Sequence, residues 1–233
     1  GALFCKNWDM AVQSPIELKY EEAVHLAGLL KSLTRWDPAA TIRIQTRGKV
    51  AGVWAKTPMD CLVFIAIPLV TEPAMPIDCV VFAARMRDIL GDLSSLTDEN
   101  RSKSYALPDD LGKPLEFAEM PPESEWVQGE KSTCGNLSDA VEKVVAEYHE
   151  QISMFPNADN KMRDYVANQV WQGKAISGFP LRCIHIARQL GFLSHANAFA
   201  NFQNVDGWKR LSTPGGQIYL DDRPKKNKLR VVK

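Results

Sequence analysis

The spacing of apolar and polar residues predicts an α+β fold for the first hundred residues. Ile16–Tyr20 alternates apolar and polar positions, as a half-buried strand does, and Glu21–Trp36 repeats apolar residues at helical spacing. Thr41–Thr46 alternates strictly, and a turn at residues 47–49 leads into Val50–Lys56. Two such runs joined by a short turn predict a β-hairpin.

The pattern then changes twice before residue 136. Cys61–Val70 is apolar at nearly every position, which is typical of a strand buried on both faces, and Ile77–Ala83 predicts a further strand that leads into a helix over 84–93. Residues 98–133 hold 9 Asp+Glu against 4 Lys+Arg and are rich in proline. That composition favours a connector, with a pair of short strands around Pro114–Met120 and Glu125–Glu130 as the alternative.

From Asn136 onward the pattern predicts helices and a final hairpin. Helical spacing of apolar residues continues to Ile152, and Pro156 ends this first helix. We expect three further helices, near Asp159–Gly173, Pro180–Leu190 and His195–Gln203, and a hairpin of Gly207–Thr213 with Gln217–Asp222 around a Pro-Gly-Gly turn.

These elements predict an N-terminal domain with a mixed α/β sheet, followed by a helical C-terminal domain that ends in a hairpin. The expected boundaries are 1–97 for the α+β domain, 98–135 for the acidic connector, 136–222 for the helical domain and 223–233 for a basic tail.

Charge is balanced over the whole chain but not along it. Residues 1–158 carry 15 Lys+Arg and 23 Asp+Glu, whereas residues 159–233 carry 13 and 5. Six of those basic residues lie in 223–233, which has no acid, so the folded part of the C-terminal region is only slightly basic. A basic segment of this kind indicates contact with a polyanion, a solvated tail, or a contact with the acidic connector.

The motif with most chemical content is Ile186-Ala187-Arg188-Gln189-Leu190-Gly191-Phe192, followed by Phe199 and Phe202. A small residue in one helix, then Leu-Gly and a new helix, is typical of a helix-turn-helix, and Gly191 would adopt the turn conformation that a Cβ disfavours. The segment is similar to the DNA-binding unit of AraC-type regulators, although its phenylalanines fall one position later. With the hairpin that follows, residues 159–222 resemble a winged helix.

A winged helix implies a DNA contact site in the C-terminal region. Phosphate contacts would come from basic side chains, and asparagine side chains of the predicted recognition helix would read adenine edges. The candidate nucleic-acid-binding residues are Arg182, Arg188, Asn197, Asn201, Lys209, Arg210, Lys225 and Lys226. The predicted recognition helix itself contains no Lys or Arg, which favours a structural or protein-docking use of the same module.

The N-terminal region carries a second resemblance. Its order of strand, helix, hairpin and two-sided strand, followed by Cys79-Val80-Val81-Phe82-Ala83-Ala84-Arg85, is similar to one domain of a DNA polymerase sliding clamp. In that family the first helix lines the DNA, and the resemblance places Lys31 and Arg35 in that role. A single such domain does not encircle DNA; a generic α+β domain is the alternative.

The sequence shows no signature of an enzyme. Glycine-rich phosphate loops, H-E-x-x-H and nucleophile elbows are missing, and the four histidines have no partner at metal-ligand spacing, so we expect no catalytic residues, cofactor or metal. The five cysteines lack C-x-x-C spacing and favour reduced, buried thiols in a cytoplasmic protein. The longest apolar run is too short to span a bilayer, which predicts no membrane partner.

The sequence therefore predicts a non-catalytic DNA-binding protein, regulatory or accessory to DNA maintenance, with duplex DNA as its partner. The alternative is a protein-interaction adaptor in which Phe192, Phe199 and Phe202 only fill a core.

Overall fold

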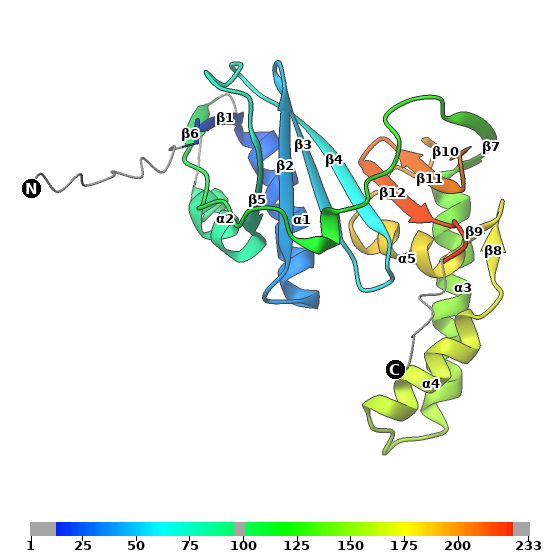
Figure 1. The fold of residues 1–233 in the computed structure, drawn as a ribbon. Helices are drawn as coiled ribbons and strands as arrows, with labels where there is room; N and C mark the ends of the chain where they lie inside the picture. Colours follow the sequence, from blue (N-terminus) through cyan, green and yellow to red (C-terminus); the bar gives the residue numbers. More distant parts are fainter. Residues whose placement is uncertain (1–12, 96–100, 226–233) are drawn as a thin grey trace, which may run out of the picture. The chain divides into compact units, whose positions relative to one another are not determined.

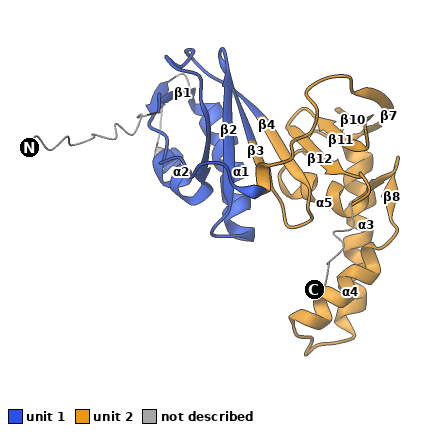
Figure 2. Ribbon diagram, in the orientation of Figure 1, with its two compact units in different colours: residues 1–53, 66–115 blue, residues 54–65, 116–233 orange. Residues whose placement is uncertain are grey.

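The structure, a computed structural model, describes residues 13–95 and 101–225 and forms two compact units (Figure 2). Unit 1 comprises residues 1–53 and 66–115, and unit 2 comprises residues 54–65 and 116–233, as far as these are described. The division passes through a hairpin, so the chain enters unit 2 once for residues 54–65 and returns to it after residue 115.

Seven strands and helices precede the connector, and β6 lies within it (Figure 1). They are β1 Ile16–Lys19, α1 Tyr20–Trp36, β2 Thr41–Arg47, β3 Val50–Lys56, β4 Leu62–Pro68, β5 Asp78–Phe82, α2 Ala83–Leu90, the 3-10 turn η1 Leu93–Ser95, and β6 Ser102–Tyr105. The strands and helices predicted over residues 16–93 are thereby confirmed, with ends that differ by a few residues.

Unit 1 is built on antiparallel pairs covered by two helices. The order of neighbouring strands is β5-β2-β3-β4, and β1 pairs separately with β6. α1 buries Ala23, Leu26 and Leu33, which recur at helical spacing on one face. α2 packs against α1 and buries Met86 and Leu90. The core of unit 1 therefore lies beneath this helix pair.

The connector and the C-terminal region supply the remaining elements. They are the 3-10 turn η2 Leu115–Phe117, β7 Val127–Thr133, α3 Cys134–Ser153, α4 Asn160–Trp171, β8 Ala175–Ile176, β9 Phe179–Pro180, α5 Leu181–Gln189, β10 Phe199–Val205, β11 Trp208–Thr213 and β12 Gly216–Asp221. The helices predicted at 136–152, 159–173 and 180–190 and the final hairpin are confirmed.

Unit 2 is organised around an antiparallel sheet rather than around helices. Its strand order is β4-β12-β11-β10-β7, so the final hairpin of β11 and β12 pairs with β10 on one side and with β4 on the other. α3 packs on both α4 and α5, and α5 contacts β12. In Figure 1, α3 and α4 form a helical hairpin whose connecting turn lies at the end away from the strands of unit 2.

The predicted winged-helix-like C-terminal domain is wrong. The segment expected to form a recognition helix, His195–Gln203, instead supplies most of β10, which pairs with β11 and β7. Ala200 and Phe202 lie two residues apart and are buried, whereas Phe199, directly before Ala200, is 61% exposed, so the segment fits a strand with neighbours on both sides, and tertiary pairing overrides the helical interpretation. Gly191 does adopt the expected turn conformation, with φ of 78°, but it ends α5 without starting a new helix.

Candidate functional site

The helix pair of unit 1 carries four exposed basic side chains, and two of them, Lys31 and Arg35, lie toward the C-terminal end of α1. Lys31 and Arg35 lie on the exposed side of α1, opposite its buried leucines, and Arg85 and Arg87 are exposed on α2. Arg87 Nη1 donates a hydrogen bond to Thr34 Oγ1 at 3.3 Å, which joins the two helices at this end. We call Lys31, Arg35, Arg85 and Arg87 the helix-pair cluster.

The acidic residues of α1 are too far away to neutralise the helix-pair cluster. Glu21 and Glu22 lie in the first turn of α1, and Arg35 lies in the last. At a rise of about 1.5 Å per residue, Glu21 and Arg35 are separated by about 21 Å along the axis. This exceeds the Debye length of about 8 Å at physiological ionic strength. Asp88 on α2 and Asp37, which caps the C-terminal end of α1, lie within two residues of the cluster in sequence, so its four cations are opposed by two acids and keep an excess of positive charge.

A structural explanation accounts for part of this arrangement. A cation in the last turn of a helix interacts favourably with the carbonyl end of the helix dipole, and Arg35 and Arg87 both occupy last turns. Lys31 and Arg85 do not lie in last turns, so the dipole does not explain their positions.

In unit 2, the predicted site residues Arg182 and Arg188 lie on α5. Arg182 Nη1 donates to Asn168 Oδ1 at 2.7 Å, and Arg188 lies 3.8 Å from the carboxylate of Glu142 on α3. His185 lies between them on the same helix and stacks on Trp171, with ring centroids 5.2 Å apart. Burial lowers the pKa of His185, and the charges of Arg188 and Arg182 lower it further, so this surface disfavours a third positive charge.

Arg210 and Asn201 lie on the opposite face of unit 2 from α5. Phe192, which follows α5, packs against Gly216, and Gly216 shares a face of β12 with the buried Ile218. Tyr219 therefore points to the other face, and Arg210 is its register partner on β11. Arg182 and Arg188 thus cannot share a contact surface with Arg210.

Arg210 belongs to an aromatic cluster on the outer face of the sheet. Its guanidinium carbon lies 4.3 Å from the centroid of the Trp126 ring and 5.7 Å from that of Tyr219. Tyr219 contacts Trp126 edge-on at 5.5 Å and Trp54 at 5.1 Å, and Trp54 contacts Phe64 at 4.6 Å. We call Trp54, Phe64, Trp126, Tyr219 and Arg210 the outer aromatic cluster.

Hydrogen bonds through amide side chains extend this cluster across the sheet. Arg210 Nε donates to Gln203 Oε1 at 2.5 Å, and Gln203 Nε2 donates to Gln128 Oε1 at 3.2 Å. Gln128 Nε2 in turn donates to Asn201 Oδ1 at 3.3 Å. Burial raises the pKa of Tyr219, whose hydroxyl donates to Gln217 Oε1 at 2.5 Å. Arg210 and Asn201 are thus held in internal contacts.

The other predicted site residues are dispersed. Lys209 Nζ donates to the carbonyl of Gly178 at 2.8 Å and lies 3.3 Å from the Asp222 carboxylate, whereas Asn197 is exposed in the loop before β10. Lys225 is exposed after β12, and Lys226 lies outside the described residues. The seven predicted residues that the structure describes therefore do not form one surface, and the role of all eight in binding nucleic acid stays a prediction.

The outer aromatic cluster was not predicted from the sequence. Trp54 and Phe64 come from β3 and β4, Tyr219 from β12, and Trp126 from the connector. Only the pairing of β4 with β12, which places Tyr219 opposite Leu62, brings these segments together. The sequence showed the two-residue period of each strand but did not show which strand lies next to it in the sheet.

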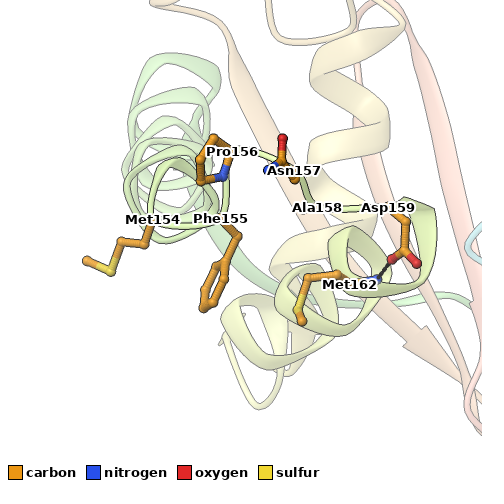
Figure 3. Close-up of a pocket in the computed structure, with 7 residues that line it drawn as sticks. All are labelled: Met154, Phe155, Pro156, Asn157, Ala158, Asp159 and Met162. Atoms are coloured by element: carbon orange, nitrogen blue, oxygen red, sulfur yellow. Dashed lines mark hydrogen bonds between the residues drawn. The ribbon is translucent and has the colours of Figure 1, made fainter.

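A shallow pocket of about 410 Å³ lies at the turn between α3 and α4 (Figure 3). Phe155 and Met162 extend on the same side of this turn, and Asp159 caps α4 by accepting a hydrogen bond from the Met162 backbone N–H at 2.8 Å. Met154, Phe155 and Met162 are 70%, 47% and 38% exposed, an unusual amount of apolar surface.

Within residues 13–95 and 101–225, no group of His, Cys, Asp or Glu side chains is arranged to hold a metal ion. Over the same residues, no helix has the length and hydropathy needed to cross a membrane.

Two family models match the chain, and both describe domains of unknown function. DUF8010 matches residues 16–104, and DUF8185 matches residues 121–225. No curated protein matches the sequence.

Solved structures of DNA polymerase sliding clamps match most of the chain. The clamp from Pseudomonas aeruginosa is 11% identical with a TM-score of 0.54, covering 94% of this chain and 68% of its own. The DNA polymerase III beta subunit from Thermotoga maritima is 13% identical with a TM-score of 0.54 (94% and 67% covered), and the clamp from Caulobacter crescentus is 14% identical with a TM-score of 0.53 (94% and 69% covered). The faint clamp resemblance of the N-terminal region is thereby confirmed and extends over both units: the chain has the fold of DNA polymerase sliding clamps.

Proposed function

We propose that this protein is a non-catalytic accessory factor in DNA maintenance that contacts duplex DNA through the helix-pair cluster of unit 1. The observation that carries the proposal is the exposure of Lys31, Arg35, Arg85 and Arg87 on two packed helices, at a distance from the acids of α1. The clamp fold supports it, because the similar structures are components of DNA polymerases by their titles.

The chemistry of the helix-pair cluster fits phosphate contacts and not base reading. Its members are all Lys and Arg, whose long side chains bind phosphate oxygens without regard to sequence. The regular helices that carry it are packed against each other, which leaves no single helix projecting toward a groove. We therefore expect weak, sequence-independent binding to duplex DNA. The expectation that the protein is cytoplasmic and not an enzyme belongs to the same proposal.

The size of the salt effect follows from the number of cations. Each neutralised phosphate contributes about 0.9 to the slope of log K against log salt, so four contacts give a slope of about −3.6. Raising the salt from about 50 to about 200 mM would then weaken binding roughly 150-fold.

The test is fluorescence anisotropy of a labelled duplex titrated with the full chain at several salt concentrations. The first variant replaces Lys31, Arg35, Arg85 and Arg87 with Gln. The control replaces four other exposed lysines with Gln, namely Lys49, Lys56, Lys103 and Lys113, and so has the same net charge. We expect the first variant to lose at least tenfold in affinity and most of the salt slope, while the control stays within about twofold.

Three results would overturn the proposal. Equal losses in the two variants would show that binding follows net charge alone. Removal of residues 226–233 is the second comparison, because those residues hold four Lys and Arg. If this truncation abolishes binding and the cluster variant leaves it intact, the basic tail and not the helix pair contacts DNA. An adaptor without a polyanion site would bind no duplex at any salt concentration.

A further inference from the structure

Two buried cysteines of unit 2, far apart in the chain, lie with their sulfur atoms in contact. Cys61 directly precedes β4, and Cys183 lies in the first turn of α5. The two Sγ atoms are 2.7 Å apart, and the residues are 0% and 4% exposed. The spacing of cysteines along the sequence gives no sign of this pair.

Backbone contacts fix the position of each cysteine. The carbonyl of Cys61 accepts hydrogen bonds from the backbone N–H of Thr57 at 3.0 Å and from its hydroxyl at 3.2 Å. The next residue, Leu62, is paired with Tyr219 in the sheet. The start of α5 is held by the Leu181 N–H, which donates to the Lys174 carbonyl at 2.9 Å. Both cysteines are thus held by fixed backbone, and their sulfurs have to close from 2.7 Å to about 2.05 Å to bond.

The surroundings distinguish the two thiols. The Cys61 thiol donates a hydrogen bond to the Cys183 sulfur, which lowers the pKa of Cys183, and the adjacent Arg182 lowers it further. The same hydrogen bond together with burial raises the pKa of Cys61. Cys183 is therefore the better nucleophile of the pair, because the thiolate is the form that reacts.

We propose that Cys61 and Cys183 form an oxidation site, at which hydrogen peroxide converts the two thiols into an intramolecular disulfide. The Cys183 sulfur attacks one oxygen of the peroxide, the O–O bond breaks, and the released hydroxide takes up the thiol proton to form water. The Cys61 sulfur then attacks the resulting sulfenic acid, an S–S bond forms, and the S–O bond breaks. The second hydroxide leaves as water with the Cys61 proton, so two thiols are oxidised and one peroxide is reduced to two waters.

The disulfide would join the start of α5 to the start of β4 and so tie a helix to the sheet on which it packs. Residues 61 and 183 are separated by 122 positions, and cross-links that close long loops restrict the unfolded chain most strongly. Oxidation is therefore expected to raise the midpoint of thermal unfolding of the whole chain.

The experiment treats the reduced full-length protein with hydrogen peroxide and then removes the peroxide. Thiols titrated in denaturant should fall from five to three, in accordance with the five cysteines of the sequence. Peptide mapping without reductant should recover one peptide pair, containing Cys61 and Cys183, with a mass two hydrogens below the sum. Reduction with dithiothreitol should restore five thiols and lower the unfolding midpoint.

Cys134→Ala is the matched control, because Cys134 is also buried and lies in unit 2, at the start of α3. This variant should still form the cross-link, and Cys183→Ala should not. Mapping on the unchanged protein decides the matter even if Cys183→Ala fails to fold. Five free thiols after peroxide, a disulfide between other cysteines, or only cross-links between chains would each overturn the proposal.

Discussion

The guanidinium of Arg210 on β11 lies over the indole of Trp126, a residue of the connector, with 4.3 Å between its central carbon and the ring centroid. The Trp126 Nε1–H donates to the carbonyl of Pro122 at 3.0 Å, so the indole is fixed from its own side as well. This contact attaches the end of the proline-rich connector to the outer face of the unit 2 sheet.

Replacing Arg210 with Met should destabilise the protein. The variant keeps the aliphatic stem but loses the cation–π contact and the hydrogen bonds to Gln203 and Tyr219. We expect a loss of about 1–3 kcal/mol in the free energy of unfolding. Urea unfolding followed by circular dichroism would measure it. Lys143→Met, at an exposed position of α3, is the control; equal midpoints for the two variants would contradict the prediction.

Gly216→Ala should be among the most damaging small substitutions in unit 2. A Cβ at this position would lie 2.6 Å from Cε2 of Phe192, whose ring is buried. Overpacking of this kind costs about 1–3 kcal/mol, since the ring has to move within a filled core. The thermal unfolding midpoint reports the effect.

Gly28→Ala provides the opposite case. Gly28 is exposed on α1, and a Cβ there meets nothing within 4 Å. Alanine is the better helix former by about 0.8–1.0 kcal/mol, so this variant should unfold at a higher temperature than the unchanged protein. If Gly28→Ala destabilises the protein as much as Gly216→Ala does, packing against Phe192 is not the cause of the Gly216→Ala effect.

Stability should fall as the pH drops below 6.5 because of His185. Its pKa in the folded state lies below the ordinary value of 6.5, mainly because the ring is buried. Above pH 6.5 the imidazole is neutral in both the folded and the unfolded chain. As the pH falls from 6.5 toward the lower folded pKa, the unfolded chain takes up a proton that the folded protein does not, and the free energy of unfolding decreases.

His185→Gln should therefore give a shallower decline of stability between pH 6.5 and the acid range. His195→Gln, at an exposed position, should leave the profile unchanged. Denaturant unfolding at a series of pH values measures both, and identical profiles for the two variants would show that the buried ring is not responsible.

Asp159→Ala should weaken the start of α4. The Asp159 carboxylate accepts the Met162 N–H, one of the amides that have no partner within the helix. Loss of an N-cap of this kind costs about 1 kcal/mol. Hydrogen exchange should quicken for the first turn of α4 and not for α3. Asp164→Ala, on the exposed surface of the same helix, is the comparison, and equal effects would exclude capping as the cause.

The sequence predicted those elements whose stability is encoded locally. α1 has an uninterrupted stripe of leucines that ends before Asp37-Pro38, and β11 and β12 flank a Pro-Gly-Gly turn, so neither depends on distant partners. The segment of β10 was predicted to be helical because the Leu190-Gly191 turn was interpreted as leading into the second helix of a helix-turn-helix. Its strand conformation depends on pairing with β7, which lies more than sixty positions earlier in the chain.

The candidate sites also divide into residues that a local pattern relates and residues that only the fold brings together. Lys31 and Arg35 could be placed on one exposed side of α1 from periodicity, whereas the companions that α2 contributes depend on how the two helices pack. The contact of Cys61 with Cys183 and that of Arg210 with Trp126 each join segments that no short-range pattern relates.

Because residues 54–65 belong to unit 2, the C-terminal part of the chain is not self-sufficient. A protein fragment limited to residues 121–225, the span of the DUF8185 match, would lack β4 and leave β12 as an open sheet edge with Tyr219 uncovered by Trp54. Exposed edges of this kind recruit other strands, so the fragment should self-associate on expression, whereas the full chain should not. Truncation studies of this protein therefore have to keep the β3–β4 hairpin with whichever half they retain.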